Sequence, residues 1–501
     1  MTKAQAAYHR LEQRFERMAI LNEASSMLSW DASVMMPSGG SAARGDQFAV
    51  LASLAHEVLI DPAVGDDLAL AQSTALESAW QDRNLHLMHH AYQRATALPT
   101  RLVEAMARSN ASCEKIWREA RKQSDFSMVA EELAEVVSLT REYAHALATV
   151  LPLSPYDCLM DGFQPGITVA DVTPLFDAYR HFLDQALPQV EALQARRPKP
   201  QPLQGPFDIG QQEALCRRLS LQAGLEADHS RLDRSTHPFC GGIPSDVRIT
   251  TRYDEQNFAK SLLGVMHETG HALYERGLPV AWLRQPVGHA AGMAAHESQS
   301  LIIEMQACRS DAWLSWLSTA LIEAFPQARA ALAPDNLAVL WRRVERGFIR
   351  VDADEMTYPA HVMMRFSLEQ ELIAGDLTVH ALPERWNALM QDLLGITPPD
   401  AAQGVLQDIH WYNGLFGYFP SYTLGAMAAA QLMQAARHAD PAIDAAMAQG
   451  RLAPLLTWLR QNVHAQGSFY GFNDLLRAAT GQPLSLDAFT QHLQQRYLQA
   501  T

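Results

Sequence analysis

Residues 254–277, DEQNFAKSLLGVMHETGHALYERG, decide the fold around the most informative motif of this chain. Asp254 is a suitable N-cap, and apolar side chains then recur at the spacing of one helix face across residues 258–266. Gly277 followed by Pro279 is typical of a helix end. The sequence therefore predicts a helix of about six turns.

The motif HETGH, residues 267–271, lies near the end of this helix. Positions i and i+4 share one helix face, so His267 and His271 can bind one metal ion with Glu268 beside it. Gly270 inside a helix costs about 1 kcal/mol relative to alanine, which indicates close packing there. The spacing is typical of zinc peptidases and points to hydrolysis. Taken alone, the motif also fits two unrelated histidines on a solvated helix turn.

A catalytic zinc site needs a third protein ligand and one open position for water. A third histidine six residues after His271 is excluded, because glycine stands at position 277. Glu297 opens a following apolar helical segment and is the preferred third ligand, although an ordinary first-turn acid would also stand there. The weaker candidates are Glu304 and Glu275.

One short segment departs from the helical character of the chain. Residues 246–253, DVRITTRY, alternate polar and apolar side chains and are rich in β-branched residues. This pattern predicts a half-buried strand immediately before the metal helix. We expect it to lie at a sheet edge, where it can pair with an extended peptide. A solvated edge strand whose charges discourage aggregation is the structural alternative, and the two are compatible.

The composition limits the class of protein. Of the 501 residues, 48% are hydrophobic, which is ample for a large core, and long Ala/Leu/Glu/Gln/Arg stretches predict a mainly helical fold. With 40 basic and 55 acidic residues, the net charge of −15 argues against binding to nucleic acid. The chain has no apolar run of about twenty residues, so we expect no membrane span. Its five scattered cysteines fit free thiols in a reducing cytoplasm.

Six motifs in order give the chain a resemblance that covers nearly its whole length. They are HPF at 237–239, DVRIT at 246–250, HETGH at 267–271, HESQ at 296–299, IRVDAD at 349–354 and GVLQDIHW at 404–411. With these motifs the sequence resembles the carboxypeptidase Taq-type family of zinc metallocarboxypeptidases. The resemblance extends from Trp30-Asp31 to the Thr480-Gly481 region.

The resemblance implies a large, mainly α zinc-peptidase fold with a deep substrate groove and a small β element beside the active-site helix. We expect a single domain over residues 1–501, with helical lobes flanking one cleft. The family further implies a cytoplasmic homodimer that acts on peptides with a free C-terminus. Broad specificity, with poor cleavage near proline, is expected as well.

The predicted mechanism assigns a role to each motif residue. His267, His271 and Glu297 would hold Zn²⁺, with Co²⁺ as an alternative metal. The C-terminal peptide bond would then be hydrolysed by Glu-assisted attack of a metal-bound water, with Glu268 as the proton acceptor.

A carboxypeptidase must also bind a terminal carboxylate, which an arginine fork does well. Arg350 is the favoured anchor and Arg248 the second candidate, with an ion pair to a nearby aspartate (Asp352, Asp354 or Asp246) as the structural alternative. His410, oriented by Asp408 or Gln407, could donate to the carboxylate or the oxyanion. The weaker substrate-binding candidates are His237 and Tyr422.

Two other classes stay open from the sequence. A non-hydrolytic binding protein would keep these motifs and release no amino acid. An endopeptidase or dipeptidase would use the same metal chemistry on other peptide bonds.

Overall fold

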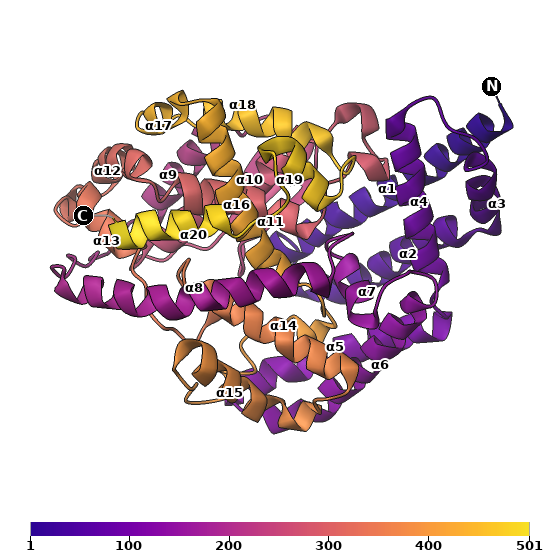
Figure 1. The fold of residues 1–501 in the computed structure, drawn as a ribbon, viewed down its shortest axis with the longest axis horizontal. Helices are drawn as coiled ribbons and strands as arrows, with labels where there is room; N and C mark the ends of the chain where they lie inside the picture. Colours follow the sequence, from indigo (N-terminus) through magenta and orange to yellow (C-terminus); the bar gives the residue numbers. More distant parts are fainter. Residues whose placement is uncertain (1, 500–501) are drawn as a thin grey trace. The chain divides into compact units, whose positions relative to one another are not determined.

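The computed structural model describes residues 2–499, most of which lie in helices. Figure 1 shows the ribbon coloured along the sequence, with the main helices labelled. The chain divides into two compact units, each assembled from three segments. The first unit comprises the described residues within Met1–Ala95, Lys199–Trp341 and Ala428–Leu484, and the second those within Thr96–Pro198, Arg342–Met427 and Ser485–Thr501. The mainly α fold with a small sheet is confirmed. The single functional domain expected for residues 1–501 stays a prediction.

The first unit holds the sheet and the HETGH helix. Its helices are α1 (Lys3–Val34), α2 (Ser41–Ile60), α3 (Pro62–Ala71), α4 (Ala79–Thr96), α9 (Ile209–Gln222), α10 (Phe258–Gly277), α11 (Met293–Leu301), α12 (Asp311–Ala324), α13 (Pro334–Trp341), α17 (Ala442–Met447), α18 (Ala453–Asn462) and α19 (Phe472–Thr480). Its strands are β1 (Ser230–Arg234), β2 (Cys240–Ile243) and β3 (Asp246–Thr251). A π-helical turn, Ile302–Ala307, continues α11.

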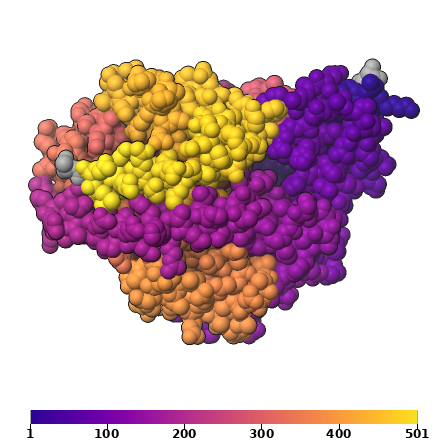
Figure 2. Space-filling model, viewed as in Figure 1, coloured from indigo at the N-terminus to yellow at the C-terminus, as the bar shows by residue number. Residues whose placement is uncertain are grey.

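The second unit consists of helices around the long α8. Its helices are α5 (Thr100–Gln123), α6 (Ala130–Ala148), α7 (Pro155–Asp161), α8 (Val169–Arg196), α14 (Tyr358–Ala374), α15 (Leu382–Leu394) and α20 (Asp487–Leu493). The remaining helix, α16 (Pro420–Ala439), begins in this unit and ends in the first. Phe176 of α8 packs edge-on against Phe366 of α14, with ring centroids 5.2 Å apart. Figure 2 shows α8 as a long magenta band that adjoins the orange α14–α15 segment.

The strand predicted at residues 246–253 is present as β3, but the edge position expected for it is wrong. β3 is the central strand of the sheet, parallel to β1 and antiparallel to β2. Val247 and Ile249 are buried, whereas Arg248 between them points to the other face, as the alternation predicted. Because both edges of β3 are paired with the chain itself, β3 cannot pair with a peptide.

The HETGH helix begins later than the sequence suggested. Asn257, not Asp254, is the N-cap, and its side chain accepts a hydrogen bond from the backbone N–H of Ala259. Asp254 instead accepts from the backbone N–H of Gln256 in the preceding turn. Both residue types cap helices well, so local propensity alone did not choose between them. The predicted end at Gly277 is confirmed.

Within residues 2–499, no single helix combines the length and apolar character that a membrane crossing requires. One bent pair, Ser38–Ile60 with Pro62–Ala71, meets both criteria together across a bend of 44°.

Candidate metal and carboxylate sites

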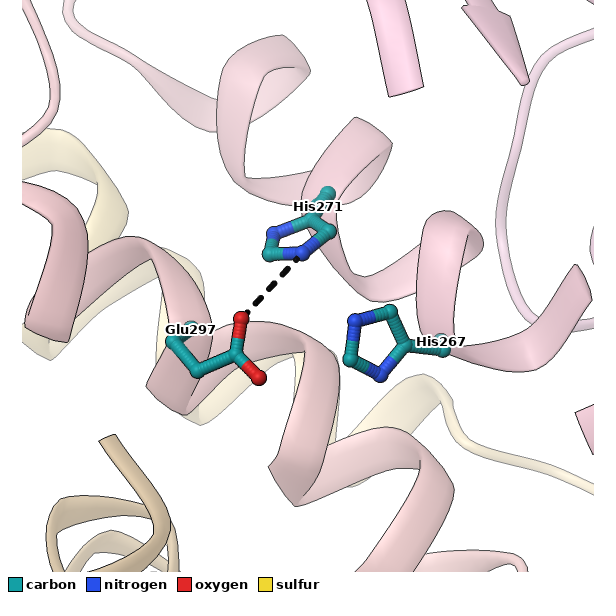
Figure 3. Close-up of side chains that lie close together, drawn as sticks. All are labelled: His267, His271 and Glu297. Carbon is teal, nitrogen blue, oxygen red and sulfur yellow. Dashed lines mark ion pairs between the residues drawn. The ribbon is translucent and has the colours of Figure 1, made fainter. Parts of the chain in front are cut away.

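Three side chains in the first unit form a group suited to a metal ion. His267 and His271 lie one turn apart on α10, and Glu297 lies on α11. One potential ligand atom from each lies within 4.8 Å of the others, and the Nε2 of His271 is 3.7 Å from Oε2 of Glu297. Figure 3 shows the three side chains pointing toward one another. Among residues 2–499, this is the one group of three or more His, Cys, Asp or Glu ligands with such geometry.

Gly270 explains why the two helices come so close. A Cβ at this position would lie 2.3 Å from the carbonyl oxygen of Gln299 and 2.6 Å from the Cα of Ser300. Only glycine therefore allows α11 to cross α10 at this point. The close packing inferred from Gly270 is confirmed, and its consequence is to bring Glu297 beside the histidines.

The nitrogen of His267 that does not face the group is held by Glu304. Its Nδ1 lies 3.0 Å from Oε2 of Glu304, whose other oxygen accepts from Arg309 at 2.6 Å. A carboxylate on Nδ1 fixes the tautomer and leaves Nε2 for a metal ion. Glu304, a weaker ligand candidate in the sequence, thus contacts Nδ1 of His267 and supports this histidine.

His271 is supported by a second chain of hydrogen bonds. Its Nδ1 lies 2.6 Å from Nδ1 of His296, and Nε2 of His296 lies 2.8 Å from Oε1 of Glu275. Since the carboxylate accepts, His296 donates from Nε2 and accepts at Nδ1, so His271 donates from its own Nδ1. This assignment leaves Nε2 of His271 as the free lone pair. Glu275, the other weaker candidate, orients His296.

Glu268 has the environment of a proton acceptor. It is buried next to the group, and burial raises the pKa of its carboxyl to about 7, with the Glu297 charge acting in the same direction and His267 opposing it. A general base works best when its pKa is near the working pH. Burial lowers the pKa of His271 well below its usual value, which favours the neutral form that binds metals.

Arg350 lies in a second polar cluster, in the second unit. It is 5% exposed, and its Nε and Nη2 donate to Oδ1 of Asp408 at 3.1 and 2.8 Å. Its Nη1 donates to the hydroxyl of Tyr358 at 2.7 Å, and its guanidinium lies 4.9 Å from the ring centre of Tyr422. Arg350 is therefore ion-paired, with Asp408 and not with the aspartates beside it in the sequence.

Asp408 is shared between two arginines. Its second oxygen, Oδ2, accepts from Nε of Arg365 at 2.8 Å. Burial by itself would raise the pKa of Asp408, but Arg350 and Arg365 hold it well below its usual value. Two cations share one carboxylate, so Asp408 does not neutralise Arg350 completely.

His410 lies in the same unit but is not oriented as predicted. Its Nε2 lies 3.2 Å from the hydroxyl of Tyr422, and its buried Nδ1 has no hydrogen-bond partner. Asp408 is engaged by the arginines, while Gln407 accepts from the backbone N–H of Arg350. The expectation that Asp408 or Gln407 orients His410 is therefore wrong. Burial lowers the pKa of His410 to about 4, so its ring is neutral near pH 7.

The two remaining candidates lie in the first unit. Arg248 makes a two-pronged ion pair with Asp246, at 3.0 and 2.6 Å, and its guanidinium lies 4.4 Å from the ring centre of Trp30. This is the structural alternative that the sequence left open for Arg248. His237 is exposed in the loop between β1 and β2, where its carbonyl accepts from the hydroxyl of Ser235.

Sequence reasoning missed Arg365, which holds Asp408, and Glu369 one turn further along α14. A signal was available, because His361, Arg365 and Glu369 recur at four-residue spacing within a largely apolar segment. Side chains at that spacing share one helix face, and buried charges on such a face require partners.

Comparison with known proteins finds relatives over nearly the whole chain. Residues 10–497 match the family described as carboxypeptidase Taq (M32) metallopeptidase. The thermostable carboxypeptidase 1 of Thermus thermophilus is 35% identical over 98% of both chains, and carboxypeptidase 1 of Bacillus subtilis is 32% identical over 98% of both. The solved structure of Trypanosoma cruzi metallocarboxypeptidase 1 is 36% identical, covers 98% of this chain and 99% of its own, and superimposes with a TM-score of 0.95.

A helical fold in which an HExxH helix lies beside a further glutamate is typical of metallopeptidases. The chain belongs to the carboxypeptidase Taq (M32) metallopeptidase family, as the resemblance predicted. It is a metallocarboxypeptidase, a hydrolase that acts on peptide bonds.

Proposed function

We propose that this protein is a zinc-dependent carboxypeptidase that releases single amino acids from the C-terminus of peptides. The observation that carries the proposal is the group of His267, His271 and Glu297 with buried Glu268 beside it. Two imidazole nitrogens and one carboxylate oxygen are the donor set of many catalytic zinc sites, and Co²⁺ accepts the same donors. Bound zinc supplies a Lewis acid that polarises the scissile carbonyl and acidifies water.

Glu268 would carry the proton during hydrolysis. As a carboxylate it accepts the proton of the attacking water, and it returns that proton to the leaving amine. A pKa of about 7 suits both transfers, because neither the charged nor the neutral form is strongly disfavoured. His267 and His271 keep their free lone pairs in place through Glu304 and His296, which reduces the reorganisation needed for each turnover.

Arg350 would anchor the terminal carboxylate. A guanidinium has five N–H donors, and three of them donate to Asp408 and Tyr358. One N–H on each terminal nitrogen is left, and such a pair matches the two oxygens of a carboxylate. His410 and Tyr422 are proposed as further substrate contacts, and His237 and Arg248 as weaker ones.

Several finer points rest on family expectation. We propose broad side-chain specificity, poor cleavage near proline, a homodimer in the cytoplasm, and no binding of nucleic acid or membranes. The net charge of −15 supports the absence of nucleic-acid binding, because like charges repel the phosphate backbone.

Peptide trimming tests the proposal directly. A peptide with a blocked N-terminus should lose residues one at a time from its C-terminal end, and zinc analysis of the purified protein should show the metal. Internal cleavage would instead indicate an endopeptidase. If amidating the C-terminus leaves the rate unchanged, the carboxylate anchor is wrong.

A further inference from the structure

One face of α14 carries polar side chains that no substrate can reach. His361, Arg365 and Glu369 lie four residues apart, and each is 0% exposed. Fully buried Arg and Glu side chains are rare unless their charges are paired. Both pair with the segment 408–417, which carries His410.

Arg365 holds the carboxylate that orients Arg350. Its Nε donates to Oδ2 of Asp408 at 2.8 Å, and its Nη2 lies 2.5 Å from the same oxygen. Its Nη1 donates to the carbonyl of His361 at 2.7 Å, and its guanidinium lies 4.5 Å from the ring centre of Trp386. These contacts immobilise Arg365 and thereby fix the position of Asp408.

Arg365 also sets the charge of the cluster. With Arg350 alone, Asp408 would form a neutral pair that has little attraction for an anion. The second arginine gives the three side chains a net charge of about +1 in a buried setting, where charge interactions are strong. Part of the positive charge of Arg350 is thus left for another carboxylate.

Glu369 holds the loop that follows His410. Its Oε1 accepts from Nε1 of Trp411 at 2.7 Å, and its Oε2 accepts from the hydroxyl of Tyr156 at 2.6 Å and the backbone N–H of Gly417 at 2.9 Å. Gly417 has a φ of +87°, and a Cβ there would lie 2.7 Å from the backbone of Leu159. Glu369 therefore holds the loop in one position, by hydrogen bonds to Trp411 at its start and Gly417 at its end.

We infer that Arg365 and Glu369 are positioning residues for binding of the terminal carboxylate of the substrate. Arg365 acts through Asp408 on the direction and net charge of Arg350, and Glu369 acts through Trp411 on His410. The inference rests on the proposed function, because it assumes that Arg350 is the anchor.

The test compares an N-acylated dipeptide with its C-terminal amide. The ratio of the two kcat/KM values measures recognition of the carboxylate, and a smaller fraction of active enzyme lowers both values without changing the ratio. In Arg365→Met and Glu369→Gln the ratio should fall about tenfold, the effect of losing about 1.4 kcal/mol of charged hydrogen bonding. Bound metal should be unchanged. Arg365→Lys keeps the positive charge but loses the planar guanidinium. Its ratio should lie between those of wild type and Arg365→Met.

The matched control is Glu371→Gln on the same helix. Glu371 forms an exposed ion pair with Arg385, so its loss should leave the ratio unchanged. An unchanged ratio in Arg365→Met and Glu369→Gln overturns the inference if Arg350→Ala abolishes the acid preference. If Arg350→Ala also keeps the preference, the proposed anchor itself fails. Should either variant not fold, Arg365→Lys and Tyr156→Phe each perturb only part of the same contacts, and the same ratio decides.

Discussion

The two polar clusters of this protein carry opposite charge imbalances. Around His267 and His271, glutamate carboxylates gather beside two imidazoles, and although burial opposes them, the charges of Glu304, Glu297 and Glu268 raise the pKa of His267 to about 10. Around Asp408 the imbalance is positive, because Arg350 and Arg365 share one carboxylate. Buried charge is costly unless a partner offsets it. The first cluster is therefore suited to a cation and the second to an anion.

The clusters resemble each other in how their central side chains are held. The Nδ1 of His267 is hydrogen-bonded to Glu304, and the Nδ1 of His271 is hydrogen-bonded to His296. Arg350 is bonded to Asp408 and Tyr358. In each case a partner distant in sequence fixes the direction of the group that would meet the ligand. Such support lowers the entropy lost on binding.

The largest expected effect is the loss of metal binding when Glu297 is removed from the first cluster. In Glu297→Ala, metal affinity should fall more than about 100-fold and peptidase activity should be lost, because a ligand is missing. Glu304→Gln, which only loosens His267, should weaken metal binding about 10- to 100-fold. Metal content after dialysis against a chelator series measures both. Equal retention in Glu297→Ala and wild type would contradict the ligand assignment.

Removing Arg350 should leave metal binding unchanged and weaken binding of the substrate's terminal carboxylate. In Arg350→Ala, kcat/KM for a free peptide acid should fall about 100-fold, as expected from the loss of a two-pronged charged contact. Metal content should match the wild type. The control is Arg385→Ala, which removes an exposed cation of the same unit and should retain full activity. Loss of metal in Arg350→Ala would show that the clusters are not independent.

Adding a methyl group at Gly270 tests the helix crossing. Gly270→Ala should destabilise the protein by about 3 kcal/mol, because backbone atoms of α11 occupy the space. Gly264 is the control on the same helix, since a Cβ there meets its nearest atom at 4.0 Å. Gly264→Ala should be neutral or stabilise by up to about 1 kcal/mol. Thermal unfolding measures both, and equal shifts would disprove the close-contact argument.

The smallest expected effect concerns Glu268. It is a dependence of stability on pH in the metal-free protein. Burial, with the Glu297 charge, raises the folded pKa to about 7 from a reference value of 4.5. The folded state then binds more protons than the unfolded state between these values, so Glu268 should lower stability as pH rises through this window. Glu268→Gln lacks this effect and should gain in melting temperature relative to wild type from pH 4.5 to above 7. A constant difference across that range would contradict the raised pKa.

Much of the first cluster was predictable because its ligand spacing is local. His267 and His271 lie on one face of any α-helix that contains them, whatever surrounds it. Glu297 required a guess about a following helix, and that guess was guided by the HESQ motif. The second cluster was only partly predictable: Arg350 was named, but its partner was sought among neighbours in the sequence.

Helix periodicity and the spacing of HETGH were determined by the sequence itself, since both depend on contacts within a few residues. The tertiary structure alone decided that β3 is central, that Glu304 and His296 support the two histidines, and that Arg350 and Arg365 share Asp408. These pairings join residues tens of positions apart. They depend on how whole helices pack, and local propensity does not encode such packing.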